Sequence, residues 1–94
     1  MKIQLEVLSG PMDGHVFQFS SSTRIGREEK IKLHLDRFVS RSHAGIEVKD
    51  SSVFVNDPKS TNGTFVDDER IQGRAQLSSG QIFRVGRTWL QINW

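Results

Sequence analysis

The sequence contains no cysteine, no long apolar run and no block of basic residues. The lack of cysteine excludes disulfide bonds, thiol nucleophiles and cysteine-ligated zinc. No apolar stretch approaches the roughly 20 residues that a membrane-spanning helix needs. The N-terminus passes directly into alternating polarity instead of the apolar segment of a signal peptide. We therefore expect a cytoplasmic protein that does not bind a membrane.

Charge and length narrow the class of protein further. Thirteen basic and eleven acidic side chains give a net charge of +2, and the basic residues are scattered among the acidic ones. This distribution does not predict a nucleic-acid-binding surface. A chain of 94 residues can bury one core, but not two domains or a deep cleft. We expect a single domain over residues 1–94 and no elaborate multi-substrate enzyme.

Alternating apolar and polar residues predict many short strands. Ile3, Leu5 and Val7 fall on one side of residues 2–8, with polar residues between them, which is the period of a half-buried strand. Strand-like runs also occupy residues 15–19, 31–35, 44–49, 53–56, 64–66, 81–85 and 88–94. No window has a sustained 3.6-residue apolar stripe, so the helices that parallel α/β folds require are missing.

Turn signals separate these runs about every ten residues. They are Gly10-Pro11, Asp13-Gly14, Asp57-Pro58, Asn62-Gly63, Asp67-Asp68 and Ser79-Gly80. Short strands at this spacing predict an all-β protein, an antiparallel β-sandwich whose two sheets cover each other's apolar faces. Most of its aromatic residues are expected in the core or packed on the sheets, namely Phe17, Phe19, Phe54, Phe65, Phe83, Trp89 and Trp94.

Three connecting segments carry hydrogen-bond donors and almost no carboxylates. They are residues 25–27, which end in Gly26-Arg27, residues 40–43, Ser-Arg-Ser-His, and residues 59–64, Lys-Ser-Thr-Asn-Gly-Thr. Loops of a sandwich cluster at its ends, where a rigid frame aims their side chains at a ligand. Guanidinium, hydroxyl and amide donors suit an anion, and a phosphate monoester fits best because it has three strong acceptor oxygens.

The order of these segments resembles the forkhead-associated (FHA) domain. Gly26-Arg27, Ser40-x-x-His43 and residues 60–64 carry the likeness, with Leu77 and Gly80 after them, and it covers essentially the whole chain. The resemblance implies a twisted sandwich of about eleven strands, with loops at one end that bind a phosphothreonine peptide. The residues that match the family's peptide contacts are Arg27, Ser40, Arg41, Thr61 and Asn62. Those that match its loop-shaping positions are Gly26, His43 and Gly63.

The resemblance predicts a phosphothreonine-dependent interaction module. Such a module catalyses no reaction, needs no cofactor and docks a partner protein that a Ser/Thr kinase has phosphorylated. Glu28 and Glu29 directly follow Arg27, so we expect them to lower the local positive potential and to favour peptides with basic flanks. Two alternatives stay open: a phosphorylation-independent structural or oligomerisation module that binds through a sheet face, and non-specific nucleic-acid binding.

A hydrolase or a metal site is not expected from these residues. Ser40 and His43, with Asp36 as the orienting acid, would also need an oxyanion hole and a substrate cleft, and nothing in the sequence marks either one. His15, His34 and His43 are widely separated and lack the spacing of metal ligands.

Overall fold

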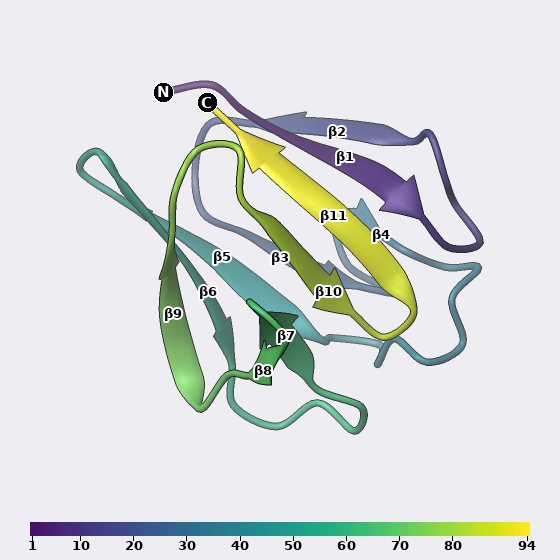
Figure 1. Cartoon of the computed structure of the whole chain (residues 1–94). Coiled ribbons are helices and arrows are strands. Elements are labelled where there is room, and N and C mark those ends of the chain that lie inside the picture. Colours follow the sequence, from purple (N-terminus) through teal and green to yellow (C-terminus); the bar gives the residue numbers. More distant parts are fainter.

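A computed structural model describes residues 1–94 as eleven strands in two sheets, with no helix (Figure 1). The strands are β1 (Ile3–Ser9), β2 (Val16–Phe19), β3 (Thr23–Gly26), β4 (Ile31–Lys32), β5 (Ala44–Lys49), β6 (Ser52–Asp57), β7 (Thr64–Val66), β8 (Glu69–Arg70), β9 (Gly73–Leu77), β10 (Ile82–Val85) and β11 (Thr88–Asn93). One sheet has the order β2-β1-β11-β10-β7-β8, and the other has the order β4-β3-β5-β6-β9. The predicted all-β sandwich is confirmed. The structure has no helix that could cross a membrane.

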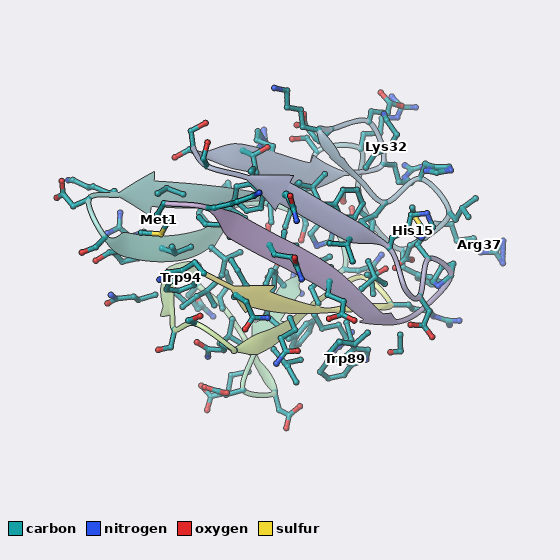
Figure 2. The ribbon with its side chains drawn as sticks, turned by 90° about the horizontal axis from the view of Figure 1, so that it is seen from above. Met1, His15, Lys32, Arg37, Trp89 and Trp94 are labelled. Carbon is teal, nitrogen blue, oxygen red and sulfur yellow. The ribbon has the colours of Figure 1, made fainter.

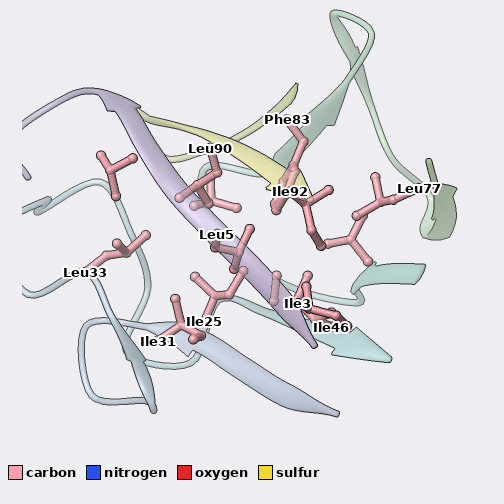
Figure 3. Packing of buried hydrophobic residues seen from close by; sticks show 14 of the residues in the cluster. Ile3, Leu5, Ile25, Ile31, Leu33, Ile46, Leu77, Phe83, Leu90 and Ile92 are labelled. Atoms are coloured by element: carbon pink, nitrogen blue, oxygen red, sulfur yellow. The ribbon is translucent and has the colours of Figure 1, made fainter. Parts of the chain in front are cut away.

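Alternating apolar residues of the two sheets form the core. The inward-facing residues of β1 are Ile3, Leu5 and Val7, which are at most 1% exposed, and they pack in one cluster with residues of the opposite sheet such as Ile25 and Ile46 (Figure 3). Burying a side chain of this size contributes roughly 1.5 to 3 kcal/mol. All strand pairs are antiparallel except β3 and β4, which are parallel.

The predicted strand over residues 31–35 is wrong beyond Lys32. Leu33 is still buried, but Leu35 is 58% exposed and the chain turns at this point. The cause is Asp36, whose buried carboxylate accepts hydrogen bonds from the backbone N–H of Arg87 at 2.8 Å and the hydroxyl of Thr88 at 2.7 Å. These bonds attach Asp36 to the β10–β11 turn. The chain therefore leaves the edge of the five-stranded sheet after Lys32.

Two strands and two aromatic positions also differ from expectation. The sequence analysis missed β8, which is two exposed residues long, and β9, in which only Ala75 and Leu77 face the core. Trp89 and Trp94 were expected in the core or packed on the sheets; they are not in the core, because they are 37% and 38% exposed. Trp89 faces outward because its neighbours in β11 fill the core, and Trp94 lies beyond the end of that strand. Phe83, by contrast, is fully buried.

Three loops and one turn gather at the end of the sandwich opposite to the termini. They are the β3–β4, β4–β5 and β6–β7 loops and the β10–β11 turn, while the two termini lie side by side at the other end (Figure 1). The view from above agrees, because Met1 and Trp94 lie at one end and Arg37 at the other (Figure 2). The strands therefore place the donor-rich segments together.

Candidate functional site

The three loops surround one open hollow of about 150 Å³. Its lining residues come from every one of these loops and include no carboxylate: Arg27, Arg37, Phe38, Val39, Ser40, Thr61 and Asn62. Of the five predicted contact residues, four line this hollow, and the exception is Arg41. Residues 34 positions apart in sequence, Arg27 and Thr61, thus face the same small space.

The predicted contact residues also hold the loops to one another. Arg27 Nε donates to the backbone oxygen of Val39 at 2.6 Å, and its two terminal nitrogens make no hydrogen bond within the chain. Asn62 Nδ2 donates to the backbone oxygen of Phe38 at 2.8 Å. The hydroxyl of Ser40 accepts a hydrogen bond from Thr61 N at 3.3 Å. Because this hydroxyl acts as an acceptor, its own proton can be donated to a ligand.

His43 joins the β4–β5 loop to the β6–β7 loop beneath the hollow. Its imidazole is 1% exposed. The backbone N–H of Ser40 donates to Nδ1 at 3.0 Å, so the ring proton lies on Nε2, which donates to the backbone oxygen of Gly63 at 2.8 Å. Both ring nitrogens are occupied by structural hydrogen bonds, and Asp36 bonds to the β10–β11 turn instead of to this ring. The three residues of the hydrolase interpretation therefore form no triad.

The β6–β7 loop is built around the buried carboxylate of Asp57. This carboxylate accepts hydrogen bonds from Ser60 N at 2.8 Å, Ser60 Oγ at 2.5 Å and Thr64 Oγ1 at 2.8 Å. Ser60 Oγ in turn accepts a bond from Gly63 N at 2.9 Å. Burial raises the pKa of Asp57, but the hydrogen bonds from Ser60 and Thr64 outweigh it and hold the pKa below its usual value. The loop that carries Thr61 and Asn62 is therefore held in shape from inside.

Two glycines permit the close approach of the loops. A Cβ on Gly26 would lie 2.2 Å from the backbone oxygen of Arg41. At this point Arg27 N donates to Ser40 O and Glu28 N donates to Arg41 O, each at 3.1 Å. Gly63 has a φ of +86°, which non-glycine residues rarely adopt. These positions join the loops without supplying a side chain to the hollow.

The two glutamates after Arg27 are paired away from the hollow. Glu28 lies 3.5 Å from Arg41 Nε, and both side chains are exposed. Glu29 accepts hydrogen bonds from Ser42 Oγ at 2.5 Å and from Arg24 Nε at 3.2 Å. The bond from Ser42 is the main cause that lowers the pKa of Glu29. Neither carboxylate lines the hollow, although Glu28 neutralises part of the charge of Arg41.

Sequence reasoning missed three lining residues, Arg37, Phe38 and Val39. They follow the run that was read as a strand over residues 31–35, so the loop appeared to be shorter than it is. Arg37 carried a usable signal, because it is a guanidinium only three residues before Ser40. The structure contains no group of three or more His, Cys, Asp or Glu side chains that could hold a metal ion.

Comparisons with known proteins identify the family. The FHA domain family model matches residues 23–86. The FHA domain-containing protein FhaB of Mycobacterium tuberculosis is 30% identical over 90 residues, which are 94% of this chain and 58% of FhaB. This chain therefore spans less than two thirds of that relative.

Solved structures agree with the sequence match. A structure from a study of phosphothreonine-dependent FHA domain interactions is 29% identical, with a TM-score of 0.86 over all of this chain and 97% of the other. Mycobacterium tuberculosis EmbR in complex with a low-affinity phosphopeptide is 28% identical, with a TM-score of 0.85 over 98% of this chain and 24% of EmbR. The family model matches more than half of this chain, and the chain therefore belongs to the FHA domain family.

Proposed function

We propose that this domain binds a phosphothreonine in a partner protein and catalyses no reaction on it. The observation that carries the proposal is the hollow in which Arg27, Ser40, Thr61 and Asn62 converge without a carboxylate. The solved structure of EmbR with a phosphopeptide, whose fold this chain shares, supports the same kind of ligand. On this proposal residues 1–94 form one binding domain, which acts in the cytoplasm after a Ser/Thr kinase has modified the partner.

The phosphate would be held by donors that already face the hollow. The free terminal nitrogens of Arg27 supply a fixed positive charge, and the hydroxyl of Ser40 and the loop of Thr61 supply further donors. A hydrogen bond to a charged group contributes roughly 1.5 to 3 kcal/mol. Three such bonds together contribute about 4.5 to 9 kcal/mol. This range includes the roughly 8 kcal/mol that micromolar binding requires. The hollow is small and open, which fits one modified side chain on an extended peptide.

Asn62 is suited to hold the peptide backbone. Its Nδ2 donates to the backbone oxygen of Phe38, which fixes the plane and the orientation of the amide. The Oδ1 atom and the second Nδ2 proton are then available for a peptide N–H and a peptide C=O. An amide held in this way pairs with an extended backbone, whereas Arg27 and Ser40 contact the phosphate.

On this proposal the phosphothreonine is not one of the threonines of the same domain. The chain has four threonines, and Thr64 and Thr88 are fully buried. Thr61 lines the hollow itself, and Thr23 is half-buried in β3. None of them can reach the hollow as a ligand of the same molecule. The ligand is therefore a separate protein or a segment beyond this domain.

Fluorescence polarisation with a phosphothreonine peptide library and its unphosphorylated copy tests the proposal. We expect binding of the phosphorylated library alone, weakened about tenfold to a hundredfold by Arg27→Ala or Ser40→Ala. Lys49→Ala is the matched control, because Lys49 is exposed at the β5–β6 hairpin, at the end of the sandwich opposite to the loops (Figure 1). Unchanged affinity in both loop variants would contradict the proposed site.

A second candidate function rests on the outer face of the six-stranded sheet. Arg84 lies 4.2 Å from the ring of Phe65 and 5.5 Å from that of Trp89, and Trp89 is 37% exposed. Aromatic and arginine side chains of this kind are enriched at protein interfaces. A phosphorylation-independent module that binds through this face would keep its partner after phosphatase treatment and lose it in Trp89→Ala.

A further inference from the structure

Arg37 is the charged lining residue whose side chain has no partner within the chain. It belongs to the same hollow as Arg27. Arg27 is bonded to Val39 O and Arg41 is paired with Glu28, but Arg37 takes part in no hydrogen bond and no ion pair. Its side chain extends outward from the loop end of the molecule (Figure 2). A free guanidinium therefore stands at the rim of the proposed phosphate site.

The backbone that carries Arg37 is nevertheless held on both sides. Phe38 N donates to Asp36 Oδ1 at 2.9 Å, and Asp36 Oδ2 is anchored to the β10–β11 turn through two further bonds. Phe38 O accepts the bond from Asn62, and Val39 O accepts the bond from Arg27. The loop is thus fixed while the side chain of Arg37 remains free, so binding through Arg37 would order one side chain and no backbone.

The charge around Arg37 is not neutralised by neighbouring carboxylates. Asp36 is the adjacent residue, but it is 1% exposed and bonded inward. Glu28 is engaged by Arg41 on the β3–β4 side of the site. Arg87 adds a second cation on this side, because its guanidinium lies 3.9 Å from the ring centre of Phe38. This rim of the hollow therefore attracts anions in addition to the one that the hollow itself would hold.

We propose that Arg37 binds a second anionic group of the ligand, placed within a few residues of the phosphothreonine. The proposal rests on the proposed function, because the phosphothreonine positions the rest of the peptide. Residues of an extended peptide are about 3.3 Å apart, so neighbours of the phosphothreonine pass over the β4–β5 loop. The second group is a carboxylate or a further phosphate, since a guanidinium pairs with either one. The partner is thus an acidic or a doubly phosphorylated segment.

Synthetic peptides test this inference directly. The parent peptide has one phosphothreonine flanked by alanines, and a series places one aspartate at each of three positions on either side. We expect at least one aspartate to strengthen binding about fivefold, in the range of an exposed ion pair. In Arg37→Gln this gain should vanish, whereas the parent peptide should lose less affinity than the tenfold or more that we expect for Arg27→Ala. Lys49→Gln removes the same charge at the opposite end and should keep the gain.

Further peptides and comparisons in the same experiment show whether the second group is a carboxylate or a phosphate, and which results would overturn the proposal. Phosphoserine in place of the best aspartate distinguishes the two sources: a larger gain identifies a doubly phosphorylated partner, and an equal or smaller gain identifies an acidic one. An aspartate profile that Arg37→Gln leaves unchanged would overturn the proposal. A loss of affinity for the parent peptide in Arg37→Gln as large as that in Arg27→Ala would also overturn it, because Arg37 would then bind the first phosphate. Equal binding of the parent and its unphosphorylated copy is a separate result, which removes the proposed function and this inference with it.

Discussion

Replacing His43 with alanine is the perturbation that tests most sharply how the loops are held together. The imidazole is buried and bonds Ser40 N on one loop and Gly63 O on another. Alanine removes both bonds and leaves a cavity where the ring was. The two backbone groups lose their partners, Gly63 O at a buried position and Ser40 N at a partly buried one.

The expected loss of stability follows from these contacts. Each buried backbone group without a partner costs about 1 to 3 kcal/mol, and the cavity adds to this cost. We expect His43→Ala to lower the free energy of unfolding by about 3 to 5 kcal/mol. For a domain of this size 1 kcal/mol shifts the melting temperature by roughly 4 to 8 °C, so the decrease should exceed about 10 °C.

Thermal and urea unfolding, followed by circular dichroism, measure this change. Ser40→Ala is the matched control, because the hydroxyl that it removes accepts only one long bond, at 3.3 Å, from the exposed Thr61. It should lower the melting temperature by less than about 5 °C while it weakens phosphopeptide binding. A melting temperature of His43→Ala within about 3 °C of wild type would refute the idea that this imidazole holds the loops together.

Further outcomes follow from the same structure. Asp57→Asn should cost about 2 kcal/mol of unfolding free energy, because the loop of Thr61 loses a charged acceptor; an unchanged urea midpoint would contradict this. The pKa of Asp57 is lowered in the fold, so its contribution to stability is complete above the unfolded pKa of about 3.9 and is lost as the pH falls through the lower folded value. Wild type should therefore lose stability below about pH 4 more steeply than Asp57→Asn, and parallel acid titrations of the two would argue against that role. Gly26→Ala should destabilise the domain by about 1 to 3 kcal/mol, since its Cβ would meet the backbone of Arg41 at 2.2 Å; a wild-type melting curve would show that the loops do not need this close approach.

Most of the fold could be predicted from the sequence because burial on one face leaves a two-residue period. Ile3, Leu5 and Val7 alternate with polar residues for this reason, and β5 and β7 were predicted with their observed bounds. The period fails where a strand has little to bury. Strand β9 lies at a sheet edge, and only Ala75 and Leu77 of its five residues face the core, so its alternation is short and easily missed.

The errors near the site have a different physical cause. The alternation of residues 31–35 was read as one strand, but side-chain hydrogen bonds of Asp36 to residues 51 and 52 positions away turn the chain after Lys32. A bond over such a distance in sequence leaves no local signal. Arg37 was consequently omitted from the candidate residues, although it lines the hollow.

The pairing of Glu28 with Arg41 also depends on the fold. The two residues are 13 positions apart, and they meet because Glu28 N donates to Arg41 O across the loops. The sequence analysis could name both residues but could not place them beside each other. The predicted preference for basic flanks stays a prediction, which a lysine series on the same parent peptide would test.

Isothermal titration of wild-type protein with one phosphothreonine peptide and its unphosphorylated copy tests the central claim most directly. Several charge-assisted hydrogen bonds depend on the phosphate, so we expect micromolar affinity for the modified peptide and at least about a hundredfold weaker binding of the copy. Equal affinities for the two peptides would contradict the claim that Arg27, Ser40, Thr61 and Asn62 form a phosphate site.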